Sequence, residues 1–217
     1  MIIFGFNNIS AVIFDLDGTM VNNMPYHQKA WRYFLKKYHI NVAPELFKRL
    51  YSGKKNTFIL PDLFKKDLSP TQIKKFSQEK EHIYQQLYSP HIKPVAGLLK
   101  TLNYLHVQNI PLAVATTAPK SNRELVFNKL KVKQYFKIIV GDEDVTKGKP
   151  HPEIYLKSAQ KLSINPKNCL VFEDSPAGVQ AAKSATMTVV ALLTTHPKEN
   201  LIGADSYIKN YNQLNPI

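Results

Sequence analysis

The sequence lacks the features that mark secreted and membrane proteins. Cys169 is the only cysteine, so no internal disulfide can form, and the apolar residues 170–172 beside it indicate a buried, inert thiol. A reducing compartment is therefore expected. No apolar run approaches the roughly 18 residues that a membrane span needs, and the N-terminus does not have the basic-then-apolar order of a signal peptide. These absences predict a cytoplasmic protein that does not associate with a membrane.

Acidic residues are scarce as well. The chain has 29 Lys and Arg against 16 Asp and Glu, a formal net charge of +13. The segment 20–93 alone holds 14 basic and 5 acidic residues. Such an excess is compatible with nucleic acid, with an anionic membrane surface or with an anionic small substrate. It is equally compatible with a lysine-rich surface that only keeps the protein soluble, so the charge alone does not select a partner.

The 217 residues suffice for one large domain, or for a domain with a smaller insert. Short apolar runs indicate buried strands, and helical patterns lie between them. The expected strands are 10–16, 112–116, 137–141, 169–173 and 186–192, and the expected helices are 95–108, 121–130, 152–162 and 177–184. Ser121, with Glu124 three residues later, is typical of a capped helix start. This alternation predicts an α/β fold with a parallel sheet.

A helical segment interrupts the alternation after the first strand. Amphipathic patterns at 27–38, 43–51, 57–64 and 70–88 are punctuated by prolines. We therefore divide the chain into a catalytic core, 1–20 and 94–217, and an inserted helical cap, 21–93. Ligands of open α/β sheets bind at the carboxyl ends of the strands. A cap that leaves from the end of the first strand is expected to cover such a site as a lid.

The first expected strand ends in the polar turn Asp15-Leu16-Asp17-Gly18-Thr19. One carboxylate of this turn could accept a phosphoryl group as a nucleophile, and the other could act first as a general acid and then as a base. Gly18 would let the backbone come close to a phosphate. The structural alternative is an acidic turn that only ends the strand.

Further polar groups follow three other strands. Thr116 and Thr117 could bind a phosphoryl oxygen through a hydroxyl and a backbone N–H, and Lys149 could neutralise its charge. Glu173 and Asp174 are adjacent acids that repel each other unless a hard cation such as Mg²⁺ lies between them and the first acid. Taken singly, these residues could equally be a structural threonine, a solvated basic turn and a helix N-cap.

In order and spacing, these motifs resemble those of the haloacid dehalogenase superfamily. The matching segments are DLDGT at 15–19, the apolar strand before Thr116, Lys149 with Pro150, and EDSPAGV at 173–179. The resemblance extends from residue 11 to about residue 214. It implies a Rossmann-like core with a helical cap inserted after the first strand.

The resemblance also implies roles for the matching residues. Asp15 corresponds to the nucleophile and Asp17 to the general acid and base. Thr116 and Lys149 would hold the phosphoryl group together with the backbone N–H groups of Leu16 and Thr117. Mg²⁺ would be bound by Asp15, by the backbone carbonyl of Asp17 and by Asp174, with Glu173 in support. Because dehalogenases lack an acid at the position of Asp17 and need no Mg²⁺, phosphoryl transfer is favoured over dehalogenation.

Residues 24–31, MPYHQKAW, are similar to the start of the cap in β-phosphoglucomutases and related sugar-phosphate phosphatases. In mutases, a histidine at the position of His27 couples cap closure to the positioning of the acid/base, although a structural role is the alternative here. Trp31 would line the cap–core interface, and residues 53–56 resemble the substrate loop of the cap. The substrate-binding candidates are Leu16, His27, Trp31, Gly53, Lys54, Lys55, Asn56 and Thr117.

Two departures weaken the similarity to mutases. The arginine expected just after Gly53 is absent, and Asn22 and Asn23 replace the acid and threonine that often follow the first motif. We therefore expect a Mg²⁺-dependent phosphatase that acts on a small phosphorylated metabolite, a sugar phosphate, as a monomer without a nucleic-acid partner.

Three alternatives to this phosphatase are kept. One is a β-phosphoglucomutase. Another is a phosphonate hydrolase that uses Lys29, Lys54 or Lys55 to form a Schiff base. The most distant is a basic nucleic-acid-binding protein on an inactive enzyme core.

Overall fold

The computed structural model describes residues 5–51 and 56–214, apart from the side chain of Lys48. Gly53, Lys54 and Lys55 of the expected substrate loop therefore lie outside the described residues. The chain divides into two compact units, one formed by Met1–Asn22 with Ile92–Ile217 and one formed by Asn23–His91. Across the described ranges, no helix combines the length and the apolar character that crossing a membrane requires.

The larger unit contains a six-stranded parallel sheet in the order β3-β2-β1-β4-β5-β6. The strands are β1 (Ala11–Phe14), β2 (Leu112–Ala115), β3 (Ile138–Val140), β4 (Cys169–Glu173), β5 (Thr188–Leu192) and β6 (Ser206–Ile208). The predicted parallel α/β fold is confirmed. The sequence analysis missed β6, because this three-residue edge strand begins with serine and has no apolar run.

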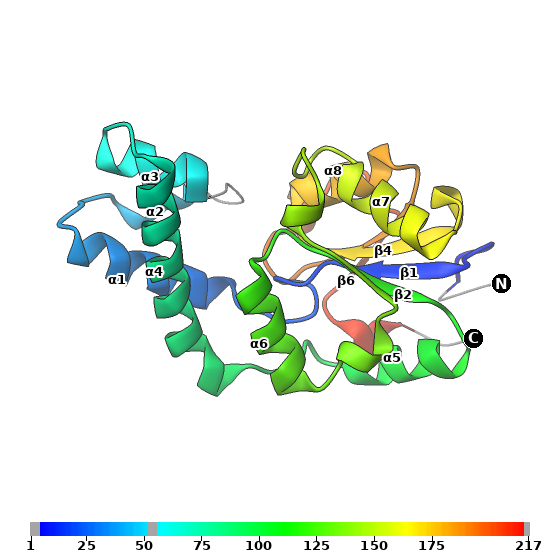
Figure 1. Cartoon of the computed structure of the whole chain (residues 1–217). Helices are drawn as coiled ribbons and strands as arrows, with labels where there is room; N and C mark the ends of the chain where they lie inside the picture. The colour runs from blue at the N-terminus through cyan, green and yellow to red at the C-terminus, as the bar shows by residue number, and fades with distance from the viewer. Residues whose placement is uncertain (1–4, 52–55, 215–217) are drawn as a thin grey trace. The chain divides into compact units, whose positions relative to one another are not determined.

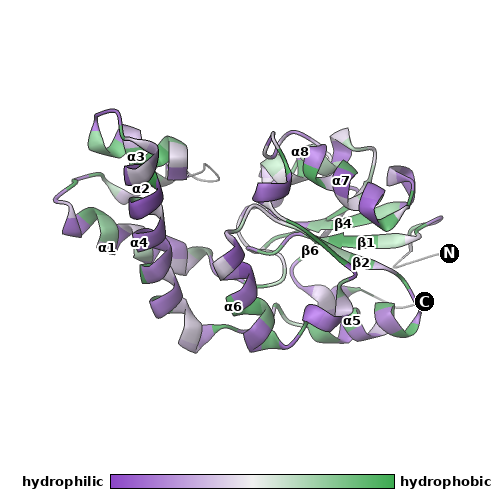
Figure 2. Cartoon of the chain, in the orientation of Figure 1, coloured by the Kyte–Doolittle hydropathy of each residue, from purple (hydrophilic) through white to green (hydrophobic). Residues whose placement is uncertain are grey.

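Helices cover both faces of this sheet (Figure 1): α7 and α8 lie on one face, and α5 and α6 lie on the other. They are α5 (Leu98–Val107), α6 (Lys120–Leu130), α7 (Glu153–Leu162) and α8 (Pro176–Ser184). Figure 2 shows the strands as the most hydrophobic part of this unit, with polar residues on the outer sides of the helices. Both faces of the sheet are therefore buried, as the near-continuous apolar strands require.

The two faces of the sheet have different cores. On one face, Ile13 and Val171 belong to a cluster of small and aliphatic side chains with Val179 of α8. On the other face, the rings of Phe14 and Phe172 stack with their centroids 5.0 Å apart, and Tyr211 packs against both. Alternate residues of each strand thus supply the two cores.

The smaller unit is helical and has its own core. Its helices are α1 (Met24–Lys37), α2 (Pro44–Tyr51), α3 (Asn56–Phe64) and α4 (Pro70–Tyr88). Trp31 and Phe34 of α1 are buried in a cluster with Leu60 and Leu63 of α3. Because the unit buries an apolar cluster of its own, its fold does not depend only on the strands that flank it in sequence.

The start of one helix differs from its predicted capping pattern. α6 begins at Lys120 after an N-cap at Pro119, which makes no side-chain hydrogen bond, so the predicted capped start at Ser121 is wrong. Pro119, with φ −54° and ψ 146°, is not helical and ends the preceding loop, which places Ser121 inside the helix. A capping box does occur at the start of α4, where Ser69 and Gln72 exchange side-chain to backbone hydrogen bonds.

Candidate active site

The carboxyl ends of β2, β1 and β4 lie side by side in the sheet and carry polar residues singled out from the sequence. Asp15 directly follows β1, Thr116 follows β2, and Glu173 ends β4. The register pairs Phe14 with Phe172. The Asp15 N–H continues this ladder by donating to the Phe172 carbonyl at 3.0 Å. Strand order therefore brings together residues that are far apart in the sequence.

Lys149 connects two of these carboxylates. Its Nζ atom lies 2.6 Å from Asp15 Oδ1 and 2.7 Å from Glu173 Oε1, and it donates to the Ala115 carbonyl at 3.2 Å. Only 8 % of the Lys149 side chain is exposed. Burial by itself would lower the pKa of this ammonium, but attraction by Asp15 and Glu173 raises the pKa well above its ordinary value. Lys149 therefore places a permanent positive charge beside Asp15.

Both oxygens of the Glu173 carboxylate accept hydrogen bonds. Oε1 accepts from Lys149 and from the Tyr155 hydroxyl at 3.0 Å, and Oε2 accepts from the backbone N–H groups of Asp174 and Ser175, each at 2.8 Å. Burial by itself would raise the pKa of Glu173, but Lys149 and the two N–H groups lower it. Glu173 is thus an anion that orients Lys149. The sequence analysis did not single out Tyr155, since a tyrosine in a helix is usually interpreted as part of the core.

The charges of the buried site do not balance. Asp15, Glu173 and Asp174 are all at least nine-tenths buried around the single ammonium of Lys149. Burial, reinforced by the Glu173 charge, raises the pKa of Asp15 to about 7 despite Lys149. Burial and the neighbouring carboxylates likewise raise the pKa of Asp174 well above its ordinary value. A cation near Asp15 and Asp174 would offset this excess negative charge.

The oxygen donors of the site can be compared with what Mg²⁺ requires. No three His, Cys, Asp or Glu side chains of the described ranges form a cluster that could hold a metal ion. Mg²⁺ does not need such a cage, because it takes one or two carboxylates and completes its shell with waters and phosphate oxygens. The hard oxygen donors of Asp15 and Asp174, with their unbalanced charge, fit that ion.

The turn after β1 packs directly against Asp174. Gly18 has a φ of +82°, and a Cβ atom built on it would lie 2.0 Å from Asp174 Oδ2. The Thr19 hydroxyl donates to Asp174 Oδ1 at 3.2 Å. Glycine is therefore required here both by the left-handed conformation and by the approach of a carboxylate. The sequence analysis expected Gly18 to make room for a phosphate and did not predict its contact with the Asp174 carboxylate.

The remaining core candidates have different environments. Thr116 is buried, and its hydroxyl oxygen accepts a hydrogen bond from the Ala118 N–H at 3.1 Å. Thr117 is exposed, Asp17 is half-buried and Leu16 is fully buried. Because the Leu16 side chain is fully buried, this residue can contribute to ligand binding only through its backbone.

The candidates in the helical unit surround a lysine that the sequence analysis did not single out. Lys80 Nζ lies 3.0 Å from His27 Nδ1 and 2.9 Å from Glu81 Oε1, and Asn56 donates to the same Glu81 oxygen at 3.1 Å. The His27 ring stacks on Tyr84 at 3.8 Å between centroids. Burial and the Lys80 charge lower the pKa of His27 well below its ordinary value, so the imidazole is neutral at pH 7.

Trp31 is buried in the helical unit. Its ring packs against Phe34 and Phe47, and the Lys80 ammonium lies 5.3 Å from the ring centroid. These contacts give Trp31 a structural role within the unit.

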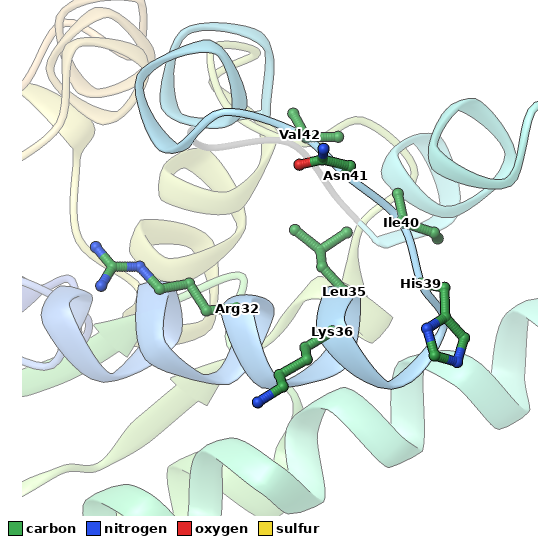
Figure 3. Close-up of a pocket in the computed structure, with 7 residues that line it drawn as sticks. All are labelled: Arg32, Leu35, Lys36, His39, Ile40, Asn41 and Val42. Atoms are coloured by element: carbon green, nitrogen blue, oxygen red, sulfur yellow. The ribbon is translucent and has the colours of Figure 1, made fainter.

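A groove of about 450 Å³ lies elsewhere on the helical unit, between α1 and the segment that follows it (Figure 3). Leu35 points into the groove. Its lining residues are Arg32, Leu35, Lys36, His39, Ile40, Asn41 and Val42. None of the candidates from the sequence analysis is among them.

Gly178 tests how tightly the site is packed. A Cβ atom on this residue of α8 would lie 1.6 Å from Glu173 Oε1 and 1.9 Å from Glu173 Cδ. We expect Gly178→Ala to destabilise the protein by about 1–3 kcal/mol or more, because Glu173 must leave its hydrogen bonds. Urea unfolding followed by circular dichroism measures this loss.

The control for this substitution is Gly203→Ala, since a Cβ atom there would meet nothing closer than Lys183 Cγ at 3.9 Å. Gly203 has a φ of +93°, so its replacement adds backbone strain without displacing Glu173. Equal losses of unfolding free energy in the two variants would contradict the proposed crowding at Glu173.

Comparisons with known proteins identify the family to which the chain belongs. The model of the haloacid dehalogenase-like hydrolases matches residues 12–192. A chloroplastic 5-amino-6-(5-phospho-D-ribitylamino)uracil phosphatase of Arabidopsis thaliana is 27 % identical over 95 % of this chain, which spans only 56 % of that relative. A phosphorylated carbohydrates phosphatase of Thermotoga maritima is 33 % identical over 82 % of both chains.

Solved structures give the same result. A hydrolase of family IA, variant 3, from Entamoeba histolytica is 29 % identical with a TM-score of 0.88, covering 95 % of this chain and 96 % of that one. A β-phosphoglucomutase from Clostridium difficile is also 29 % identical, with a TM-score of 0.82 and coverage of 95 % and 93 %. Both phosphatases and mutases are thus among the similar proteins.

Proposed function

This chain belongs to the haloacid dehalogenase-like hydrolases and is a phosphoryl-transfer enzyme; we propose that it is a Mg²⁺-dependent phosphatase of small phosphorylated metabolites. The observation that carries the proposal is the buried contact of Lys149 Nζ with Asp15 Oδ1 at 2.6 Å, at the carboxyl edge of the sheet. A nucleophilic carboxylate beside a fixed cation suits attack on a phosphate dianion, which would otherwise be repelled. A sugar phosphate is the proposed substrate.

The residues that would hold Mg²⁺ are Asp15, the backbone carbonyl of Asp17 and Asp174. When bound, Mg²⁺ would neutralise phosphoryl oxygens and so favour attack by an anion. Glu173 supports the site by holding Lys149 through Oε1, at 2.7 Å from Nζ.

The first half-reaction forms an aspartyl-phosphate. A carboxylate oxygen of Asp15 attacks phosphorus, and the bond from phosphorus to the ester oxygen breaks. Asp17 gives its proton to the departing oxygen, so the alcohol leaves neutral. Lys149, the Thr116 hydroxyl and the backbone N–H groups of Leu16 and Thr117 hold the phosphoryl oxygens during the transfer.

The second half-reaction releases phosphate. Asp17, now a carboxylate, takes a proton from water, and the water oxygen attacks phosphorus. The bond between phosphorus and the Asp15 oxygen breaks, which restores the free carboxylate. One acidic residue thus acts in both protonation states, as general acid–base catalysis of a two-step transfer requires.

A β-phosphoglucomutase is the second candidate function, favoured by the solved mutase that covers 95 % of this chain at 29 % identity. In that reaction Asp17 would take its proton from a sugar hydroxyl, and this hydroxyl would accept the phosphoryl group. The two functions differ only in the acceptor, so the products distinguish them.

A screen of phosphorylated metabolites tests the proposal. Purified protein is incubated with sugar phosphates and Mg²⁺, and β-glucose 1-phosphate is tested with and without a bisphosphate activator. We expect release of inorganic phosphate, its loss with EDTA and its return with excess Mg²⁺. Isomerisation of β-glucose 1-phosphate without phosphate release would establish the mutase instead. Full activity in EDTA would contradict the requirement for Mg²⁺.

A further inference from the structure

The segment that follows β5, residues 193–196, packs against the acidic site although no motif marks it. The Thr194 hydroxyl donates to the Gly18 carbonyl at 2.5 Å. The Thr195 hydroxyl contacts both the Asp174 carboxylate, through Oδ2, and the Asp174 backbone carbonyl at 3.0 Å. His196 Nδ1 lies 3.1 Å from the same carbonyl. The segment is thus tied to two of the loops that form the site.

These contacts hold both oxygens of the Asp174 side chain. The Thr19 hydroxyl donates to Oδ1 at 3.2 Å, and Thr195 contacts Oδ2. A hydroxyl has a single proton, and a carboxylate is a stronger acceptor than a carbonyl. We therefore assign the Thr195 proton to Oδ2. His196 then carries its proton on Nδ1, which lies 3.1 Å from the Asp174 backbone carbonyl and 2.9 Å from the Thr195 hydroxyl oxygen, and both oxygens can accept from it.

The Asp174 carboxylate needs such support because its neighbours repel it. Asp15 and Glu173 place further negative charge in the same buried region, and Asp174 itself is only 4 % exposed. Gly18 closes one side of the carboxylate, since a Cβ atom there would lie 2.0 Å from Oδ2 and 2.8 Å from Thr195 Cγ2. The two hydroxyl donors and this backbone contact together select one orientation of the side chain.

We propose that Thr195 is a positioning residue that, together with Thr19, holds the Asp174 carboxylate in the orientation that binds a divalent cation. This inference rests on the proposed function, in which Asp174 is a Mg²⁺ ligand. Residues that hydrogen-bond to a metal ligand commonly change metal affinity by about 10–100-fold when they are replaced. Loss of the Thr195 hydroxyl is therefore expected to weaken Mg²⁺ binding more than it weakens the fold.

The test compares three variants of the full chain. Thr195→Val keeps the side-chain shape and removes the hydroxyl, whereas Thr195→Ser keeps the hydroxyl. Thr188→Val, at the other end of β5, is the matched control. Isothermal titration with Mg²⁺ alone gives the dissociation constant, and turnover at increasing Mg²⁺ gives the concentration for half-maximal activity. We expect both to rise about 10-fold or more in Thr195→Val and to stay near wild type in the other two variants.

Thermal unfolding in EDTA shows whether each variant folds. Thr195→Ala, which adds no volume, replaces Thr195→Val if the valine variant does not fold. Equal Mg²⁺ affinity in folded Thr195→Val and wild type would overturn the inference and leave the proposed function intact. Equal losses of Mg²⁺ affinity in the valine and serine variants would also overturn it, because the missing hydroxyl would then not be the cause of the weaker binding. Absence of Mg²⁺ binding by the wild-type protein would overturn both proposals.

Discussion

We expect Asp15→Asn to lower kcat by at least about 10⁴-fold, which corresponds to roughly 5.5 kcal/mol of transition-state stabilisation. An amide cannot replace the carboxylate as the nucleophile that accepts the phosphoryl group. The fold should persist, because asparagine has nearly the same shape and Lys149 keeps its contact with Glu173 at 2.7 Å. Phosphate release on the best substrate of the screen measures this loss.

The same comparison identifies the covalent intermediate. Wild-type protein quenched with acid during turnover should carry phosphate on the peptide that contains Asp15, as seen by mass spectrometry, and Asp15→Asn should not. Asp67→Asn, at an exposed residue of the helical unit, is the matched control and should retain wild-type turnover. A rate for Asp15→Asn within tenfold of wild type would exclude the aspartyl-phosphate route, provided that mass analysis excludes deamidation.

The second large effect concerns stability. Lys149→Met should lower the free energy of unfolding by roughly 3–5 kcal/mol, because breaking a buried ion pair leaves its partners uncompensated. Here two carboxylates, Asp15 and Glu173, lose their contacts with one ammonium. For a chain of this size the change corresponds to a decrease in Tm of about 10 °C. Thermal unfolding in EDTA measures it without a contribution from bound metal.

The loss in Lys149→Met should also grow as the pH rises. The pKa of Asp15 is raised to about 7 even with Lys149 present, and that of Asp174 is raised as well. A carboxyl whose folded pKa lies above its unfolded value, about 4, stabilises the fold at low pH and loses this contribution as the pH rises. Lys149 itself stays charged across this range, because its unfolded pKa is about 10.4, so the pH dependence of the loss comes from ionisation of the carboxyls around it.

The difference in Tm between wild type and Lys149→Met should therefore be larger at pH 8 than at pH 5. Lys147→Met removes an exposed lysine from the same loop and should change neither the Tm nor its pH dependence. A pH-independent difference would show that Lys149 contributes packing rather than charge.

The sequence predicted those strands and helices whose physical cause lies in a local pattern of residues. The run at 169–173 predicts β4 with its observed bounds, because a fully buried parallel strand is apolar throughout. The prediction at 186–192 begins two residues early, and the edge strand β6 was missed. The predicted capped start at Ser121 was wrong because the same capping pattern can also occur inside a helix. Pro119 decides where α6 begins.

The sequence by itself determined the strand ends and therefore which edge of the sheet carries Asp15, Thr116 and Glu173, since a parallel sheet places the carboxyl ends of its strands together. Only the tertiary structure decided how these charges are paired. Lys149 bridges Asp15 and Glu173. The Tyr155 hydroxyl donates to Glu173, and the Thr195 hydroxyl donates to Asp174. Such contacts join residues from separate loops, and in a low-dielectric interior they depend on ångström-scale distances that no local pattern encodes.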